Sequence, residues 1–253
     1  PEAGLVDLHR GDAYGRSFAD VYDHWYHGVS DAEATARFVA ARCGGAPVLE
    51  LGVGSGRLAE PLVDLGVRVI GLDASSDMLD RCPRPSATAG SLQLIRADMR
   101  ALPLAGNIGA VLIAFNTLFN LSSRDEQQRL FLELAPLVGA TGAIIVEALD
   151  ATPLSAGPDR SIGAREVDDD GVVVTAIQVD KVAQTLTGQH LQVDHRGVAV
   201  RPWRLCWLTP DQLDELATEA GFRLAERYRS WDGLPFTSGD ETHISLYRAA
   251  RQT

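Results

Sequence analysis

The stretch Val48–Leu58 constrains the fold of this chain more than any other. Its sequence, VLELGVGSGRL, begins with an apolar run that predicts a buried β-strand over Val48–Leu51. Gly52, Gly54 and Gly56 then predict a tight turn that leads into a helix. Glycine adopts positive φ and has no Cβ, so this backbone can turn sharply and let a ligand approach closely. Open α/β sheets bind their ligands at loops of this kind, where a parallel strand ends.

The same alternation of apolar strands and helices continues to about residue 150. The predicted strands are Val67–Leu72, Leu92–Arg96, Ile108–Phe115 and Gly142–Leu149, and the predicted helices are Arg57–Leu65, Ser76–Arg81 and Arg124–Leu137. Continuous apolar strands are typical of a parallel sheet whose two faces are both covered. The pattern therefore predicts an α/β fold with a doubly wound, mostly parallel sheet and right-handed crossovers.

The residues before this core predict a helical cap. Asp31 is a candidate N-cap for a helix over Ala32–Arg42. Upstream of it, aromatic residues recur three or four apart, which places them on one face of a single helix: Tyr14, Phe18, Tyr22 and Trp25. This face either packs on the core or reaches the mouth of a ligand site, and both interpretations are open.

The pattern changes after Asp150. Helical periodicity is absent, and glycine-containing turn signals occur at Asp170-Gly171, Thr187-Gly188 and Arg196-Gly197. The strand-like stretches are Glu166–Asp180, Lys181–Thr187, Gln189–His195 and Val198–Leu208. We expect an antiparallel β insertion. A small sheet needs a partner for its second face, so we expect it to form a lid or an oligomer contact.

The end of the chain predicts a helix followed by two strands. Thr209 is a candidate N-cap with Pro210 at the first helical position, and the helix should end at Ala220. Phe222–Ser230 and Thr242–Ala249 should form an antiparallel pair at the sheet edge. We therefore interpret residues 1–253 as a single domain in four parts: cap 1–44, core 45–150, insertion 151–208 and closing segment 209–253.

Composition excludes several classes of protein. The net charge of −11 argues against nucleic acid as a partner, since phosphate binding needs basic clusters. No apolar run reaches the roughly 18 residues of a membrane span. The three scattered cysteines form neither a metal motif nor a disulfide framework, which suggests a reducing cytoplasm. No secretory leader is visible, and Pro1 suggests that the natural start lies upstream.

The loop points to a nucleoside-containing ligand. Asp73 ends the second predicted strand, where an acid accepts hydrogen bonds from ribose hydroxyls. Dinucleotide-binding loops place a small residue at the sixth motif position, but this chain has Arg57 there. Glu50, two residues before the first glycine, would repel a pyrophosphate and suits an ammonium or sulfonium group.

With this acid-x-Gly-x-Gly-x-Gly motif, the sequence resembles the class I S-adenosylmethionine-dependent methyltransferases over about residues 45–150, and its closing strand pair matches that family. The resemblance implies S-adenosylmethionine as cofactor, S-adenosylhomocysteine as product, and no metal. It also implies that the glycine loop passes under the methionine part, that Asp73 holds the ribose, and that Asp98 reaches the adenine amino group. The cofactor residues implied are Tyr22, Glu50, Gly52, Gly54, Gly56, Arg57, Asp73, Ala74, Met78, Asp98, Met99, Ala114 and Phe115. Glu50 either contacts the ligand or orients the loop, and Met78 either packs on the adenine or belongs to the core.

A finer resemblance concerns the acceptor. The segment AFNTLFN after the fourth strand lacks the Asn/Asp-Pro-Pro-Tyr/Phe motif of enzymes that methylate DNA bases, and no catechol-type set of metal-binding acids is present. The tyrosine-rich cap and the β insertion are similar to small-molecule N-methyltransferases that act on amino sugars and antibiotic precursors. This resemblance implies catalytic roles for Tyr14, Tyr22 and Phe115, and substrate contacts from Tyr14, Trp25, Tyr26, Asn116, Phe119 and Trp203.

Methyl transfer from a sulfonium requires alignment and exclusion of water more than a catalytic motif. We expect the tyrosines to orient an amine rather than deprotonate it, because a phenol has a pKa near 10. His190 and His195 are candidate bases in the insertion, and Arg201 and Arg204 are candidate partners for an anionic substrate group. An O-methyltransferase, an NAD-dependent oxidoreductase and a non-catalytic binding protein remain alternatives. The expected partners are a small-molecule substrate and a second copy of the chain.

Overall fold

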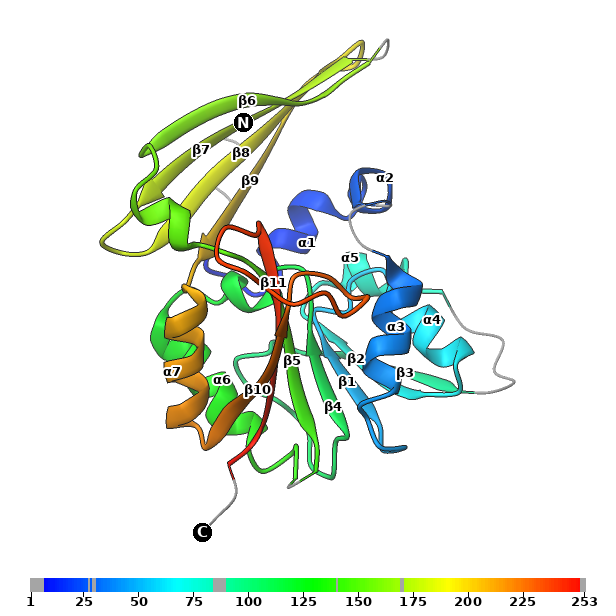
Figure 1. Ribbon diagram of the computed structural model, residues 1–253. Helices are drawn as coiled ribbons and strands as arrows, with labels where there is room; N and C mark the ends of the chain where they lie inside the picture. The colour runs from blue at the N-terminus through cyan, green and yellow to red at the C-terminus, as the bar shows by residue number, and fades with distance from the viewer. Residues whose placement is uncertain are drawn as a thin grey trace.

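The chain folds around a seven-stranded sheet with the order β10-β11-β5-β4-β1-β2-β3 (Figure 1). The computed structural model describes residues 7–26, 28, 31–83, 90–139, 141–168 and 171–250. Five strands run parallel: β1 (Val48–Leu51), β2 (Arg68–Asp73), β3 (Ser91–Arg96), β4 (Ala110–Ile113) and β5 (Ala143–Leu149). β11 (Thr242–Ala249) pairs antiparallel with β5, and β10 (Phe222–Tyr228) pairs antiparallel with β11. The predicted fold class and closing strand pair are confirmed.

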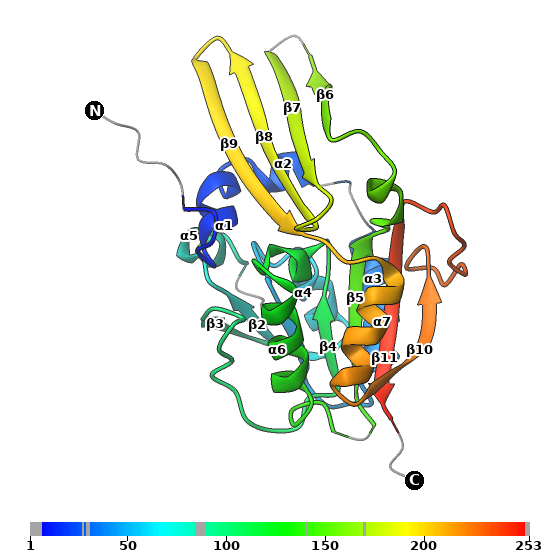
Figure 2. The same cartoon turned by 90° about the vertical axis from the view of Figure 1, so that its left-hand side faces the viewer.

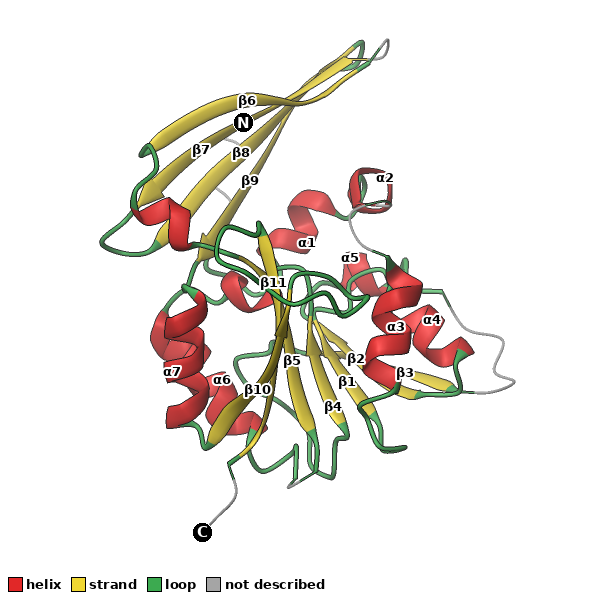
Figure 3. Ribbon diagram, in the orientation of Figure 1, coloured by secondary structure: helices red, strands yellow, loops and turns green. Residues whose placement is uncertain are grey.

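Helices cover both faces of this sheet (Figure 3). α3 (Ala32–Ala40) and α4 (Ala59–Asp64) lie on one face, and α6 (Arg124–Leu134) and α7 (Pro210–Glu219) lie on the other. Successive strand residues point to opposite faces, so the buried residues separate into two clusters. Leu49 and Leu51 pack towards α6 and α7, whereas Val48 packs towards α3 and α4. Each fully buried Leu or Val contributes about 1.5–3 kcal/mol of transfer free energy.

Local sequence signals set where several helices begin. The side chain of Asp31 accepts a hydrogen bond from the Ala34 amide at 2.9 Å, as predicted for an N-cap. Thr209 and Gln212 form a reciprocal capping box at the start of α7, and Pro210 occupies the first turn. Caps of this kind typically stabilise a helix by about 1 kcal/mol.

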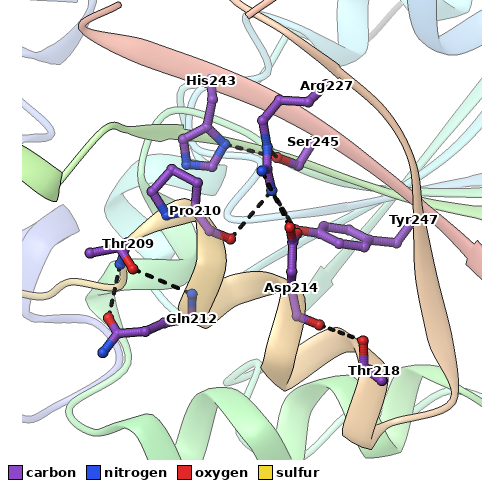
Figure 4. A network of polar contacts seen from close by, with 9 residues as sticks. All are labelled: Thr209, Pro210, Gln212, Asp214, Thr218, Arg227, His243, Ser245 and Tyr247. Carbon is purple, nitrogen blue, oxygen red and sulfur yellow. Dashed lines mark hydrogen bonds and ion pairs between the residues drawn. The ribbon is translucent and has the colours of Figure 1, made fainter. Parts of the chain in front are cut away.

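A polar network fixes the closing strands to α7 (Figure 4). The Arg227 guanidinium on β10 lies 2.6 Å from Oδ1 of Asp214 on α7, and the Tyr247 hydroxyl on β11 donates to the same oxygen at 2.7 Å. Arg227 Nε also donates to Ser245 Oγ at 2.8 Å. The half-buried ion pair therefore connects three elements that are separated along the sequence.

The insertion forms a second, four-stranded antiparallel sheet (Figure 2). After the short helix η2 (Thr152–Ser155), the chain runs through β6 (Arg160–Val167), β7 (Gly171–Asp180), β8 (Thr185–Asp194) and β9 (Gly197–Cys206). Figures 1 and 2 show this sheet projecting from the carboxyl edge of the main sheet, beside the N-terminal helices. The insertion is therefore placed where the parallel strands end.

Within the insertion, one strand was not predicted and one predicted turn was wrong. β6 was not predicted, because an edge strand that is exposed along most of its length lacks a buried face that would mark it in the sequence. The predicted turn at Thr187-Gly188 lies inside β8, and the chain turns at residues 181–184 instead. A Cβ on Gly188 would lie 2.1 Å from Cζ2 of Trp203, so this glycine makes room for an aromatic ring rather than for a turn.

The cap also differs from prediction. The expected single aromatic helix is two short helices, α1 (Ala13–Phe18) and α2 (Tyr22–Tyr26), separated by residues 19–21. The Tyr14 and Phe18 rings still stack with centroids 4.5 Å apart, and Phe18 is fully buried. Other element ends shift by one to three residues, as in α5 (Ser76–Leu79). Residues 84–89 of the predicted loop, and Asp170, lie outside the described residues. None of the described helices is long and apolar enough to cross a bilayer.

Candidate functional site

A cavity of about 420 Å³ lies between the carboxyl ends of the parallel strands, the N-terminal helices and the insertion. Its volume falls within the usual range for sites that bind small molecules. Of the cofactor residues predicted from the sequence, the following line it: Tyr22, Gly52, Gly54, Asp73, Ala74, Met78, Asp98, Met99 and Phe115. Of the predicted substrate residues, Tyr14, Tyr26, Asn116 and Trp203 also line it.

The glycine loop forms the floor of the cavity. Gly52, Gly54 and Gly56 all have positive φ, at 70°, 57° and 86°. A Cβ on Gly52 would lie 2.6 Å from Cγ2 of Thr117, so a side chain there would collide with the segment after β4. A Cβ on Gly54 would meet nothing closer than Tyr22, at 3.9 Å. The three glycines thus permit a backbone conformation that brings the loop, Thr117 and Tyr22 together.

Asp73 ties the loop to the end of β2. Its carboxylate accepts hydrogen bonds from the amides of Gly54 at 3.0 Å and Ser75 at 2.8 Å. Burial raises the pKa of this carboxyl above its ordinary value, and the backbone hydrogen bonds oppose the shift. Each carboxylate oxygen has a further lone pair that can accept a ligand hydroxyl.

Glu50 lies in β1 directly before the loop and is not among the residues that line the cavity. Its side chain is buried, and Oε2 has no hydrogen-bond partner within the described part of the chain. Burial raises the pKa of this carboxyl to about 8, although Arg57 opposes the shift. Gly56, Arg57 and Ala114 likewise do not line the cavity. These four residues therefore lie in the layer behind the cavity wall, which for Glu50 agrees with the second of its two considered roles, orienting the loop.

A strained turn after β4 forms another wall. Phe115 and Asn116 adopt left-handed backbone conformations, with φ of 49° and 61°, although neither is glycine. Such residues cost about 1–3 kcal/mol each and persist where surrounding contacts hold them. Here, Glu147 accepts hydrogen bonds from the amide of Phe115 at 2.8 Å and from Trp231 Nε1 at 2.9 Å. Asn116 Oδ1 accepts from the Leu149 amide at 2.7 Å.

Glu147 was missed in the sequence. Burial raises the pKa of its carboxyl, and the hydrogen bonds from Phe115 and Trp231 oppose the shift. The available signal was an acid in the middle of the otherwise apolar β5. Because buried carboxylates need partners, that signal could have indicated a structural role beside the site.

Four aromatic rings, three from the cap and one from the turn after β4, form a continuous aromatic wall. The ring centroids of Tyr14 and Tyr22 are 6.4 Å apart, those of Tyr22 and Tyr26 are 4.9 Å apart, and those of Tyr26 and Phe115 are 5.3 Å apart. Burial raises the pKa of Tyr14 well above its usual value and that of Tyr22 to about 12. Both phenols are therefore neutral at physiological pH. Electron-rich ring faces attract cations, and a phenol oxygen accepts hydrogen bonds.

The insertion forms the roof. His190 on β8 is buried, and its Nδ1 lies 2.7 Å from Oγ1 of Thr175 on β7. Its ring contacts those of Phe18 and Trp203, with centroids 5.7 Å and 5.9 Å away. Burial and the nearby cations Arg165 and Arg201 lower the pKa of His190 to about 4, so the ring is neutral. The other predicted base, His195, is exposed at a hairpin and does not line this cavity.

Two predicted substrate contacts are corrected. Phe119 is fully buried in the core beneath α6 and does not line the cavity, because the 3₁₀ helix η1 (Thr117–Asn120) turns its side chain inwards. Trp25 lines a separate groove between α2 and the insertion. Its ring centroid lies 5.6 Å from that of His190, which does line the cavity. Of the predicted anion partners, Arg201 pairs with Asp20 at 2.6 Å, whereas Arg204 lines the cavity.

Comparison with known proteins identifies the family of this chain. Residues 48–142 match a family profile described as a methyltransferase domain. The structure is similar to that of the CcbJ methyltransferase from Streptomyces caelestis, with 35% sequence identity and a TM-score of 0.87, over 94% of this chain and 98% of that chain. The chain belongs to the class I S-adenosylmethionine-dependent methyltransferases.

Two further relatives support this assignment. The cypemycin N-terminal methyltransferase of a Streptomyces species is 24% identical over 195 residues, which is 77% of this chain and 79% of that protein. CalS10, described as an amino pentose methyltransferase of Micromonospora echinaspora, shares the fold with a TM-score of 0.65 and 19% identity, over 89% of this chain and 96% of that chain. The alternatives of an oxidoreductase and of a non-catalytic protein are excluded by this membership.

The site fits the methyl donor of this family. Glu50 Oε2 is a buried acceptor without a partner among the described residues, next to the loop predicted to hold the ammonium-bearing methionine part. Within the described residues, no group of three or more His, Cys, Asp or Glu side chains is arranged to hold a metal ion. The enzyme uses S-adenosylmethionine, whose sulfonium supplies the activated methyl group.

Proposed function

We propose that this enzyme methylates an amine nitrogen of a small natural-product intermediate, such as an amino sugar or an amino-acid-derived antibiotic precursor. The observation that carries the proposal is the aromatic wall of Tyr14, Tyr22, Tyr26 and Phe115, in which burial keeps the phenols of Tyr14 and Tyr22 neutral. A neutral phenol oxygen can accept a hydrogen bond from an amine N–H and thereby direct the nitrogen lone pair. The proton released after methylation passes to water.

The choice of nitrogen over oxygen rests on the absence of a suitable base. A hydroxyl acceptor usually needs a base whose pKa lies near the working pH. His190 is the only imidazole lining the cavity among the described residues, and its pKa of about 4 makes it a weak base. An amine needs no such group, because its free-base form is already a nucleophile. The amine class is also supported by relatives that are named for N-terminal and amino-pentose methylation.

We assign the two ends of the cavity different tasks. Asp73 would hold the ribose hydroxyls, and Ala74, Met78, Asp98 and Met99 would surround the adenine. Glu50 would balance the ammonium charge from behind the loop. Tyr14 and Tyr22 would orient the acceptor, while His190 and Trp203 in the roof exclude water. Exclusion of water strengthens each polar contact in the site.

The proposal is tested with the purified enzyme, S-adenosylmethionine and matched acceptors. Each amino sugar or amino-acid amide is paired with its hydroxyl analogue, and the position of the transferred methyl group is read by mass spectrometry and NMR. We expect transfer to nitrogen only, with Tyr14→Phe lowering kcat more than cofactor affinity. Transfer to the hydroxyl analogues at a comparable rate would contradict the proposal.

The pH dependence gives a second test. Tyr22 titrates at about 12 and His190 at about 4, so neither should control the rate between pH 6 and 9. At saturating cofactor, kcat/KM should rise with pH and level off at the pKa of the acceptor amine. Two acceptors of different basicity should therefore give different inflection points. A common inflection point that persists in Glu50→Gln would indicate a base in the enzyme.

A further inference from the structure

One carboxylate joins the cap to the cofactor end of the site. Asp23 lies on α2, directly after Tyr22. Its Oδ1 accepts a hydrogen bond from the Ser55 hydroxyl at 2.6 Å, and its Oδ2 accepts one from Arg81 Nε at 3.1 Å. Ser55 belongs to the glycine loop, and Arg81 lies just after α5. The side chain of Asp23 therefore connects the cap with two elements of the core.

The two contacts of Asp23 differ in their surroundings. Ser55 is buried, and a hydroxyl that donates to a carboxylate makes the stronger, charge-assisted kind of hydrogen bond. The ion pair with Arg81 is exposed, with the side chains 40% (Arg81) and 50% (Asp23) accessible to solvent, and exposed pairs contribute little. We therefore assign the anchoring of α2 mainly to the contact between Asp23 and Ser55.

The turn itself does not require a serine at position 55. Positive φ occurs at the three glycines of the loop but not at Ser55, and Ser55 does not line the cavity. The loop is instead held from two sides. The Gly54 amide donates to Asp73 at the end of β2, and the next residue, Ser55, donates to Asp23 on the cap. The hydroxyl of Ser55 thus serves the contact with the cap.

The helix α2 depends on such contacts for its position. It has five residues, and a helix of this length is not stable by itself. The Tyr22 ring lies beside Gly54, since a Cβ on this glycine would be 3.9 Å from Cε1 of the ring. The next residue of the helix, Asp23, binds the next residue of the loop, Ser55. Two adjacent contacts therefore fix where α2 lies over the loop.

We propose that Asp23 and Ser55 form a clamp that positions the Tyr22 hydroxyl over the bound cofactor. Both are positioning residues, because they act through the tyrosine and do not line the cavity. The inference rests on the role of Tyr22 in the proposed function. A misplacement of about 1 Å can lower a rate about 100-fold. Loss of the clamp leaves Tyr22 correctly placed part of the time, so we expect kcat to fall about tenfold.

A spectroscopic test needs no acceptor. The whole enzyme is labelled with 3-fluorotyrosine and saturated with S-adenosylhomocysteine, and ¹⁹F NMR resolves its five tyrosines. The Tyr22 signal is assigned by its loss in Tyr22→Phe. Ser55→Ala and Asp23→Ala should shift or broaden this signal, whereas Ser55→Thr, which keeps the hydroxyl, should preserve it. The signal of Tyr247, buried against α7, should stay in place in all variants.

Kinetics with an acceptor that the wild type methylates give a second readout. Ser55→Ala should lower kcat about tenfold and change the dissociation constant of S-adenosylmethionine less than about threefold. In a Tyr22→Phe background the same substitution should lower kcat less than about twofold, because residues that act through one another are not additive. Asp77→Ala is the matched control, since it removes an exposed acid from α5 without touching the clamp, and it should leave both readouts unchanged.

The outcomes separate this proposal from others. A Tyr22 signal that is unchanged in both alanine variants would overturn it, as would an equal loss of kcat from Ser55→Ala with and without the Tyr22 hydroxyl. Displacement of all five signals together with a lower melting temperature would indicate a role in stability alone and would also overturn it. Methyl transfer to hydroxyls instead of amines would contradict the proposed function, but the Tyr22 signal would still decide whether the clamp exists.

Discussion

Replacing Glu50 with Gln tests whether the buried carboxyl beneath the glycine loop is retained for the ligand. In the ligand-free enzyme its Oε2 has no partner among the described residues, and burial raises its pKa from 4.5 to about 8. At pH 7 the carboxyl is therefore largely protonated. Gln has the same shape and is neutral at every pH, so it imitates the protonated form without the cost of ionisation.

The magnitude follows from proton linkage. A group whose pKa is raised in the folded state favours folding below its unfolded pKa, and this contribution is lost as the pH rises through the folded pKa. For Glu50 the window runs from 4.5 to about 8. At ~1.4 kcal/mol per pH unit, wild type should lose about 3–4 kcal/mol of unfolding free energy relative to Glu50→Gln between pH 5 and pH 8.

Urea unfolding of the ligand-free wild type and variant at pH 5, 6, 7 and 8 measures this difference. Glu60→Gln is the control, since Glu60 is exposed on α4 and its substitution should have no pH-dependent effect. Calorimetry provides a second readout. Wild-type affinity for S-adenosylmethionine should strengthen as the pH rises towards 8, because the ammonium group favours the ionised carboxylate, and the variant should lack this trend.

A stability difference between Glu50→Gln and wild type that stays constant from pH 5 to pH 8 would refute the reasoning. It would mean that Glu50 is ionised throughout, stabilised by its environment without a ligand. Equal pH dependence of cofactor binding in both proteins would remove Glu50 from any role towards the ammonium group.

Three further substitutions test other parts of the site. Asp73→Asn should weaken cofactor binding about 10- to 100-fold, as measured by calorimetry, because it removes charge-assisted hydrogen bonds. Asp77→Asn, at an exposed position, is the control and should leave the affinity unchanged. Equal cofactor affinities of Asp73→Asn and wild type would exclude Asp73 from ribose binding. Tyr22→Phe should lower kcat at least about tenfold with little change in cofactor affinity, and unchanged kinetics would make it a packing residue. Gly188→Ala should raise KM for the acceptor, since the added Cβ would lie 2.1 Å from the Trp203 ring. Gly163→Ala is the control, because a Cβ there meets no atom within 4 Å, and this variant should behave as wild type. A wild-type KM in both variants would mean that the roof does not shape the acceptor end.

The cofactor half of the site could be predicted because its signals are local. Gly52 to Gly56 follow β1 directly, and Asp73 ends β2, which pairs in parallel with β1, so the acid and the loop meet at the same sheet edge. A strand, a glycine turn and an acid at the next strand end specify their own geometry through backbone sterics and the parallel pairing of buried strands. The same reasoning predicted the five parallel strands along the chain and the caps at Asp31 and Thr209.

The acceptor half was decided by tertiary structure. Glu147 holds the left-handed turn at Phe115 from a strand 32 residues away, and Thr175 meets His190 only through the β7–β8 register. Gly188 reads as a turn residue in the sequence, but in the structure a glycine is needed there because the ring of Trp203 on the neighbouring strand leaves no room for a Cβ. Long-range pairing of antiparallel strands determines which side chains share a face, and a register shift of one residue exchanges the two faces. The sequence alone therefore determined the fold and the class of cofactor, whereas only the folded chain placed the aromatic wall and the roof.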